Sequence, residues 1–241
     1  MKKIAAIVLC VLLTGCAATI SSKLINKNYQ SLAESSNVFV LQPSMNVPLQ
    51  SELIGEIKIG DSGFSVDCGY NKVLTEAQNL ARKAGANIIQ IIDLKEPNFF
   101  GSSCYRLKAK IYRNMSDGAL AQLNDKNKST LPQDTDYAVV YFYRPFSDLG
   151  GILGYKINVD NDSVIGRMRN GEKFEFHTKK FGKQIFYGQI ETKEEVKINI
   201  ERGQEYYVRC GIKTGTFVGR PELTSVENYI GRKEYAETNS Q

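Results

Sequence analysis

The strongest strand signal in the chain is Tyr137-Ala138-Val139-Val140-Tyr141-Phe142-Tyr143-Arg144-Pro145. β-Branched and aromatic side chains fill this stretch, and they favour the pleated, half-buried surface of a sheet. The stretch ends at a proline, which cannot donate a hydrogen bond to a neighbouring strand. The sequence therefore predicts that the second half of the chain opens with a buried β-strand.

Six more short strands are predicted downstream, at the spacing typical of an all-β domain. Turn residues separate several of them, namely Asp160-Asn161-Asp162, Asn170-Gly171 and Arg202-Gly203. The predicted strands are Tyr155–Val159, Ser163–Met168, Lys173–Thr178, Gln184–Tyr187, Val196–Ile200 and Glu205–Lys213. A helix is predicted only near the end, within Leu223–Tyr235. Residues 137–241 are therefore expected to form a β-sandwich-like domain.

This half resembles an uncharacterised domain family found mainly in bacterial lipoproteins. The resemblance lies in Tyr141 to Pro145, in the hairpin of Ile157-Asn158-Val159-Asp160 with Ile165-Gly166, in Asn170-Gly171, and in Gly203 with Glu205 to Arg209. Because the family has no established activity, the resemblance implies an architecture and a location but no mechanism.

The first half is expected to be a small α+β domain over residues 38–113. Strand-like alternation marks Val38–Leu41, Ile54–Ile59, Ala86–Leu94 and Tyr105–Tyr112, and a helix is predicted around Val73–Ala84. Thr75 and Gln78 have the spacing of a capping box, and Gly85 stands where a left-handed helix C-cap is favoured.

The N-terminus has the layout of an export signal. Two lysines precede an apolar run from Ile4 to Leu13, which is about half the roughly 20 residues that a membrane-spanning helix needs. The next residues, Leu13-Thr14-Gly15-Cys16, resemble the cleavage site of bacterial lipoproteins. The resemblance implies cleavage before Cys16, acylation of Cys16 and anchoring by its acyl chains. An ordinary signal peptide cut near Ala17-Ala18 is the alternative.

Position 17 is Ala and not Asp, which by the same resemblance favours the outer membrane, with the protein most simply facing the periplasm. Disulfides persist in that compartment, and Cys68 and Cys104 are the preferred pair. A metal site is the alternative for these two cysteines, although neither a CxxC motif nor a nearby histidine supports it. Cys210 is left over as a buried thiol or as one half of an interchain bridge.

Residues 53–113 also resemble the periplasmic domain of the outer-membrane lipoprotein family that senses envelope stress for the Rcs phosphorelay. The shared features are a Gly-rich turn before Cys68, an Ala-rich helix ending in Gly85-Ala86-Asn87, an Ile-rich strand, and Cys104 opening a last strand. The family carries two disulfides in this domain, whereas this chain has two cysteines there. The resemblance implies a shared fold more strongly than a shared signalling role.

Two polar segments complete the predicted organisation. Residues 16–37 are interpreted as the lipid attachment and a tether, and residues 114–136 as a linker between domains. The full division is a cleaved signal peptide (1–15), the attachment and tether (16–37), the α+β domain (38–113), the linker (114–136) and the β-sandwich domain (137–241).

A candidate ligand or partner surface comprises Arg144, Tyr206, Tyr207 and Arg209. Arginine offers a planar fork to carboxylate or phosphate, and tyrosine offers an apolar body with a polar tip. A structural role for these residues is the preferred interpretation, because Tyr206 and Tyr207 must point to opposite faces of a strand. We expect one of the two tyrosines in the core and the other on the surface.

The residue inventory argues against most enzymatic chemistries. His177 is the single histidine, and we expect it to face solvent beside Glu175. A multi-histidine zinc site is therefore excluded, and no phosphate-binding or nucleophile motif is present. The 31 basic and 26 acidic side chains give a formal charge of +5, and removal of Lys2 and Lys3 leaves +3, which is no nucleic-acid signature.

The sequence therefore predicts a non-enzymatic, membrane-anchored lipoprotein that needs no cofactor and no metal. It would act as a binding or accessory module for an envelope protein or complex. The alternatives are an envelope-stress sensor and a carboxylate-based hydrolase of envelope polysaccharide.

Overall fold

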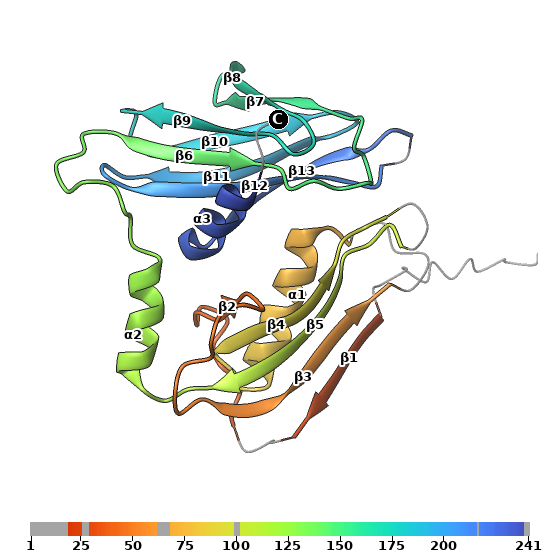
Figure 1. Cartoon of the computed structure of the whole chain (residues 1–241), viewed down its shortest axis with the longest axis vertical. Helices are drawn as coiled ribbons and strands as arrows, with labels where there is room; N and C mark the ends of the chain where they lie inside the picture. The colour runs from red at the N-terminus through yellow and green to blue at the C-terminus, as the bar shows by residue number, and fades with distance from the viewer. Residues whose placement is uncertain (1–18, 26–28, 62–67, 99–101, 216, 239–241) are drawn as a thin grey trace, which may run out of the picture.

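The computed structural model describes residues 19–25, 29–61, 68–98, 102–215 and 217–238 (Figure 1). Within these ranges the regular structure is mainly β, since the strands form three β-sheets and three helices lie beside them. The expectation of a β-rich chain is confirmed. The predicted signal peptide and the acylation site Cys16 lie outside the described residues.

Five strands of the first half form one sheet, in the order β1-β3-β5-β4-β2. Neighbours run antiparallel, except that β2 and β4 are parallel. The strands are β1 (Thr19–Leu24), β2 (Phe39–Leu41), β3 (Glu52–Gly60), β4 (Ile88–Lys95) and β5 (Arg106–Arg113). Helix α1 (Tyr70–Lys83) buries Val73, Ala77 and Ala81 in one cluster with isoleucines of the sheet.

Strand β1 corrects the interpretation of residues 16–37 as a tether. It pairs with β3 along its whole length, from Thr19 opposite Gly60 to Leu24 opposite Gly55. Leu24 and Tyr29 also pack against the buried cluster. The segment is polar because β1 is an edge strand, which is held by backbone pairing on one side and faces water on the other.

Helix α1 begins five residues earlier than its predicted cap. Thr75 lies inside the helix, and the first helical residue, Tyr70, follows an N-cap glycine, Gly69. The capping group comes instead from a distant strand, since Glu222 accepts hydrogen bonds from the backbone N–H groups of Tyr70 and Asn71, both at 3.1 Å. The predicted C-cap is confirmed, because Gly85 adopts a φ of 78°.

The predicted linker contains a helix, α2 (Asp117–Lys126). The side chain of Ser116 caps this helix by accepting from the N–H of Ala119 at 3.3 Å. Leu123 is buried in a small cluster with Phe39, Leu41 and Ile88 on the first sheet. Helix α2 therefore packs on the first half, whereas Thr130 bonds to Glu205 of the second half, so residues 114–136 do not form a free linker.

The second half consists of two four-stranded sheets, in the orders β13-β12-β6-β9 and β11-β10-β7-β8. One buried cluster takes side chains from both sheets, including Phe142 and Val208 from the first and Ile157 and Phe186 from the second, so the sheets pack as a sandwich. The strands are β6 (Ala138–Tyr143), β7 (Tyr155–Val159), β8 (Ser163–Met168), β9 (Lys173–Thr178), β10 (Gly182–Gln189), β11 (Lys193–Ile200), β12 (Glu205–Lys213) and β13 (Arg220–Val226).

Helix α3 (Asn228–Glu237) lies between the sandwich and the first half, as Figure 1 shows in dark blue. Ile230 joins the buried cluster of the first sheet, whereas Gly231 lies so close to Tyr207 of β12 that a Cβ at this position would overlap its ring. The helix predicted within Leu223–Tyr235 therefore begins later than expected, because the chain first forms β13.

Candidate functional site

Arg144, Tyr206, Tyr207 and Arg209 do not line a common surface. Arg144 and Arg209 are 1% and 5% exposed, and each guanidinium is hydrogen-bonded within the chain. The two arginines therefore have the structural role that the sequence favours, and they do not offer a ligand surface. The two arginines instead organise two other parts of the molecule.

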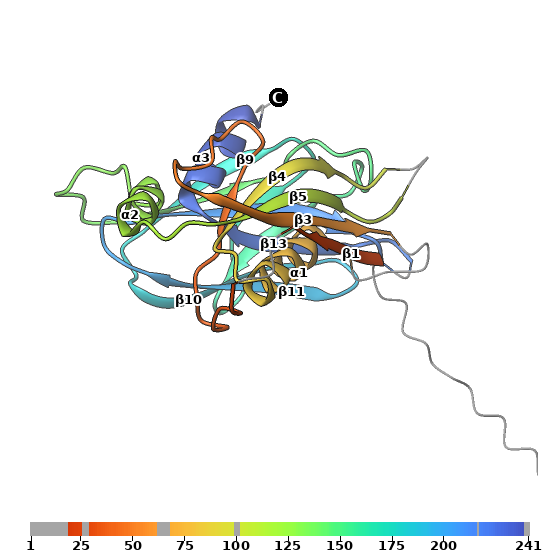
Figure 2. The same cartoon turned by 90° about the horizontal axis from the view of Figure 1, so that it is seen from below.

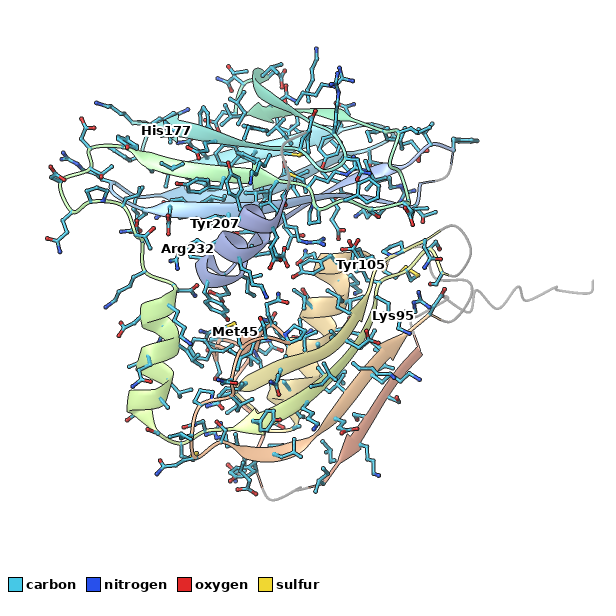
Figure 3. The ribbon with its side chains drawn as sticks, viewed as in Figure 1. Met45, Lys95, Tyr105, His177, Tyr207 and Arg232 are labelled. Carbon is cyan, nitrogen blue, oxygen red and sulfur yellow. A yellow bond between two sulfur atoms is a disulfide. The ribbon has the colours of Figure 1, made fainter. Side chains whose placement is uncertain are left out.

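Arg209 joins the two halves at the centre of their interface. Its guanidinium donates to Glu96 at 2.9 Å and to the Tyr105 hydroxyl at 3.1 Å, both from the first half, and to Glu234 of α3 at 3.1 Å. It also lies over the ring of Tyr70, 4.2 Å from the centroid. Figure 3 shows Tyr105 where the first half approaches the sandwich.

The charge of Arg209 is stabilised despite its burial. Burial by itself lowers the pKa of Arg209, but the surrounding Tyr105, Glu234, Tyr70 and Glu96 together hold it well above the ordinary value. The guanidinium is therefore a permanent cation paired with two carboxylates, which is the arrangement that a buried charge requires.

The two tyrosines beside Arg209 are also used internally. The ring of Tyr207 is buried and stacks on Tyr141, with 4.7 Å between ring centroids. Tyr206 points to the other face, packs against the sandwich core and donates its hydroxyl proton to the Asn199 carbonyl at 2.9 Å. The expectation of one core and one surface tyrosine is wrong, because α3 covers the face that would otherwise be open.

Arg144 holds the loop between β6 and β7. Its guanidinium donates to the carbonyls of Gly150 at 2.8 Å and Leu153 at 2.7 Å. Asn170 adds a second clamp, because its amide oxygen accepts from the N–H of Ser147 and its amide nitrogen donates to the Ser147 carbonyl, each at 3.0 Å. The backbone of this loop is therefore fixed by the buried Arg144 at its start and by the partly buried Asn170 of a neighbouring turn.

Glu191 holds the loop between β12 and β13 in a similar way. One of its carboxylate oxygens accepts from the N–H groups of Phe217 at 2.7 Å, Val218, and Gly219 at 3.1 Å. A Cβ at Gly215 would overlap this carboxylate, so the loop approaches Glu191 as closely as a glycine permits.

These two clamped loops present apolar side chains to solvent and line a groove of about 940 Å³. The exposed fractions are 68% for Phe146, 100% for Ile152, 91% for Phe217 and 59% for Val218. Single exposed apolar residues are ordinary, but a contiguous apolar patch on a rigid backbone marks a binding surface. We refer to Phe146, Ile152, Phe217 and Val218 as the apolar tips.

A second hollow, of about 580 Å³, lies at one end of the first sheet. Its lining is predominantly basic, because it has four basic side chains and two acidic ones, Asp61 and Asp93. The basic residues are Lys58, Lys95, Arg106 and Lys108. The Nε–H of Arg106 is buried and has no hydrogen-bond acceptor among the described residues. We refer to these four residues as the basic cluster, which is suited to an anionic group.

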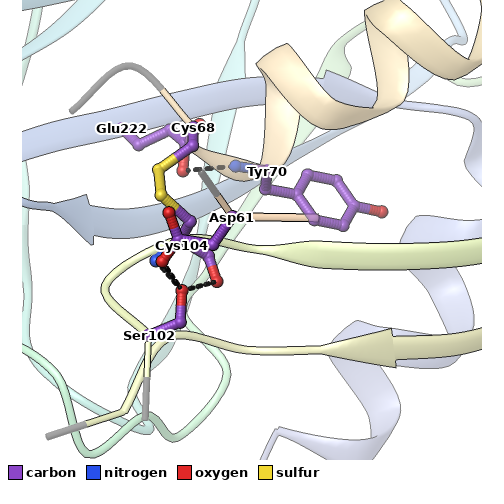
Figure 4. The surroundings of a disulfide bond; sticks show 6 residues. All are labelled: Asp61, Cys68, Tyr70, Ser102, Cys104 and Glu222. Carbon is purple, nitrogen blue, oxygen red and sulfur yellow. Dashed lines mark hydrogen bonds between the residues drawn. A yellow bond between two sulfur atoms is a disulfide. The ribbon is translucent and has the colours of Figure 1, made fainter. Parts of the chain in front are cut away.

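The disulfide of Cys68 and Cys104 lies beside this hollow (Figure 4). Ser102 donates to Asp61 at 2.5 Å, and its hydroxyl accepts from the N–H of Cys104 at 3.0 Å. The predicted pairing of the two cysteines is confirmed. The disulfide joins the start of α1 to the start of β5 and so fixes one wall of the hollow.

Cys210 is buried in β12, as one of the two alternatives for this thiol predicts. Burial raises the pKa of the Cys210 thiol to about 12. Because the thiolate is the reactive form, the buried thiol is unsuited to forming an interchain bridge.

His177 faces solvent, as expected, with its Nε2 at 3.1 Å from a carboxylate oxygen of Glu175. Among the described residues, no group of three or more His, Cys, Asp or Glu side chains is arranged to hold a metal ion. In the same part of the chain, every helix is too short or too polar to span a bilayer.

Sequence reasoning missed the apolar tips. Gly150-Gly151-Ile152-Leu153-Gly154 has the glycine content of a turn, and the large apolar Ile152 lies within it. The same pattern recurs where Phe217-Val218 stands between Gly215 and Gly219. Large apolar residues inside glycine-rich loops are the signal that could have identified this surface.

Comparison of the chain with protein-family models, with curated proteins and with solved structures finds no match.

Proposed function

We propose that this chain is a bacterial lipoprotein, acylated at Cys16 and held on the periplasmic side of the outer membrane. In this proposal it acts by binding, as an accessory module of an envelope protein or complex, and not by catalysis. The export signal and the residues Leu13 to Cys16 support the anchor.

The observation that carries the proposal is the position of β1. Strand β1 begins at Thr19, three residues beyond Cys16, and a chain of three residues spans at most about 10 Å. An acyl anchor at Cys16 would therefore hold the folded part directly at the lipid surface. A folded protein held so close to the lipid surface would contact neighbouring membrane-bound partners directly.

We also propose that the chain comprises two domains, a small disulfide-bonded α+β domain followed by a β-sandwich-like domain. Separate buried clusters support this division. The Arg209 network and α3 join the two domains. A fixed arrangement of two domains presents one defined shape to a partner, as accessory modules do.

The anchor is tested by comparing the wild-type protein with Cys16→Ala in cells fed an acyl-chain probe. The wild-type protein is expected to incorporate the probe and to fractionate with outer membranes, whereas Cys16→Ala is expected to lose both properties. Cys210→Ala is the matched control and should behave like wild type. Failure of the wild-type protein to incorporate the acyl-chain probe would overturn the proposed anchor.

The accessory role is tested by crosslinking in living cells, followed by mass spectrometry of the purified protein. A specific envelope protein captured by the wild type and not by Cys16→Ala would support the proposal. Capture of only polysaccharide or lipid by the anchored protein would contradict a protein partner.

A further inference from the structure

The apolar tips lie at the end of the molecule where β1 begins. Figures 1 and 2 show the start of β1 at the right, and the loop between β12 and β13 reaches the same end. The groove lined by both clamped loops places the tips of the β6–β7 loop beside those of the β12–β13 loop. Four exposed apolar side chains therefore belong to loops at the same end of the molecule as the start of β1.

The basic cluster lies at this end as well. The hollow is lined by Ser21, two residues after the start of β1, and by Gly60, which pairs with Thr19. Figure 3 shows Lys95 at the same end. Lysine and arginine side chains at a lipid surface attract anionic headgroups. The Nε–H of Arg106, which has no acceptor within the part of the chain that the structure describes, can donate a hydrogen bond to one of them.

The clamps keep the apolar tips outside the protein core. Arg144 and Asn170 fix one loop, and Glu191 fixes the other. Since these backbone groups are held, the tips stay exposed, and contact with an external apolar phase would remove their surface from water.

We infer that this end of the protein lies on the membrane, with the apolar tips inserted in the leaflet that holds the acyl chains of Cys16 and the basic cluster over anionic headgroups. The inference rests on the proposed anchor, and it names the lipid surface as the occupant of the groove. A lipid surface is favoured over a protein because an acyl anchor at Cys16 would hold Thr19, at this same end, within about 10 Å of the bilayer.

The absence of tryptophan from the sequence provides a direct test. Ile152→Trp and Phe217→Trp each introduce a unique fluorophore at an exposed tip, where the fold is not disturbed. Leu49→Trp is the control, because Leu49 is 89% exposed but lies at the far end of β3. Leu49 precedes Glu52, and the strand from Glu52 to Gly60 is about 27 Å long at 3.4 Å per residue.

The acylated variants are reconstituted in vesicles of phosphatidylglycerol and phosphatidylcholine, with bromine on the acyl chains of the phosphatidylcholine. Emission from Ile152→Trp and from Phe217→Trp is expected to fall at least about two-fold relative to unbrominated vesicles, as for side chains at the acyl boundary. Emission from Leu49→Trp is expected to be unchanged.

Two failures are distinguishable. Vesicle-bound protein without quenching at either tip would overturn the lipid-surface inference and leave the anchor standing; a protein crosslinked through position 152 in cells would then identify the groove as a protein-binding site. Purified wild-type protein that carries no acyl chain and does not bind vesicles would overturn the proposed anchor, and the inference with it.

Discussion

At the scale of single residues, Glu222 performs the role that a neighbouring Ser, Thr or Asp performs at most helix N-termini. It lies about 150 positions along the chain from α1, yet its two carboxylate oxygens accept from Tyr70 and Asn71. Gly69 is the residue that admits the carboxylate, because a Cβ there would overlap it. The contact joins β13 of the sandwich to the first helix.

Gly69→Ala is therefore expected to destabilise the protein by displacing Glu222. Overpacking and loss of a helix cap together give an expected decrease of about 1–3 kcal/mol in the free energy of unfolding. Gly118→Ala is the matched control, because Gly118 lies on an exposed turn of α2 and a Cβ there has its nearest neighbour at 3.9 Å. Chemical denaturation of both variants measures the difference, and equal stability of the two would contradict the role of Gly69.

Glu222 also predicts a dependence of stability on pH. Burial raises the pKa of Glu222 above its ordinary value of 4.5, although the hydrogen bonds from Asn71 and Tyr70 and the charges of Arg209 and Lys213 offset part of the shift. A carboxyl whose pKa is higher in the folded state stabilises that state most at pH values below its pKa in the unfolded chain. This stabilisation is lost as the pH rises through its pKa in the folded protein.

The Tm of the wild type minus that of Glu222→Gln is therefore expected to be largest near about pH 4 and to decrease as the pH rises. Glu222→Gln keeps one acceptor and removes the titration. Thermal unfolding in a series of buffers measures the difference. A difference that increased with pH would show that the hydrogen bonds outweigh burial.

At the scale of elements, the disulfide ties α1 to β5. Cys68 and Cys104 close a loop with a sequence separation of 36, and the backbone carbonyl of Cys68 also accepts from the N–H of Tyr105 at 3.1 Å. In the chain-entropy description, closure of such a loop stabilises the folded state by about 3–4 kcal/mol.

Replacement of both cysteines, Cys68→Ser with Cys104→Ser, is expected to lower the free energy of unfolding by about that amount. A reductant should lower the Tm of the wild type and of Cys210→Ala, and it should have no effect on the double variant. Insensitivity of the wild type to reduction under unfolding conditions would contradict a stabilising disulfide.

Elements with an alternating pattern were predictable, and elements defined by distant neighbours were not. The predicted bounds of β7, β8, β9 and β12 are confirmed. These strands were predictable because each has turn residues at its ends or alternates between apolar and polar side chains. Strand β13 was missed because Pro221 to Thr224 are buried in succession, on both faces, which removes the alternation. Pro221 is tolerated there because β13 is the edge of its sheet.

The candidate functional residues also divide into those that were predictable from the sequence and those that were not. The disulfide and the solvent-facing His177 were predictable, since they depend on compartment and on strand alternation. Burial of Arg144 and Arg209 was not, because their acceptors come from loops and from the other half of the chain. A strand pattern gives the direction of a side chain but not the element that covers it.

At the scale of the whole molecule, the two halves are joined through α3 and a set of buried polar contacts. Glu205 of β12 accepts from Arg232 of α3 at 2.8 Å and from Thr130, which precedes the sandwich, at 3.2 Å. Tyr229 of α3 donates to the Val40 carbonyl of β2 at 2.7 Å. Since α3 contacts both halves, unfolding of one half exposes a surface of the other, and we expect a single calorimetric transition.

Arg209→Met tests this coupling. The substitution retains an apolar stem but leaves Glu96 and Glu234 without their buried cation, and removal of one partner from such a network costs about 3–5 kcal/mol. Because each half keeps its own buried cluster, the loss falls on the interface, and we expect the single transition to separate into two, the first at a lower temperature. Arg167→Met, at an exposed position of β8, is the control and should unfold like the wild type. One unaltered transition for Arg209→Met would show that α3 couples the halves without the charge network, whereas two transitions in the wild type would show that the halves unfold independently.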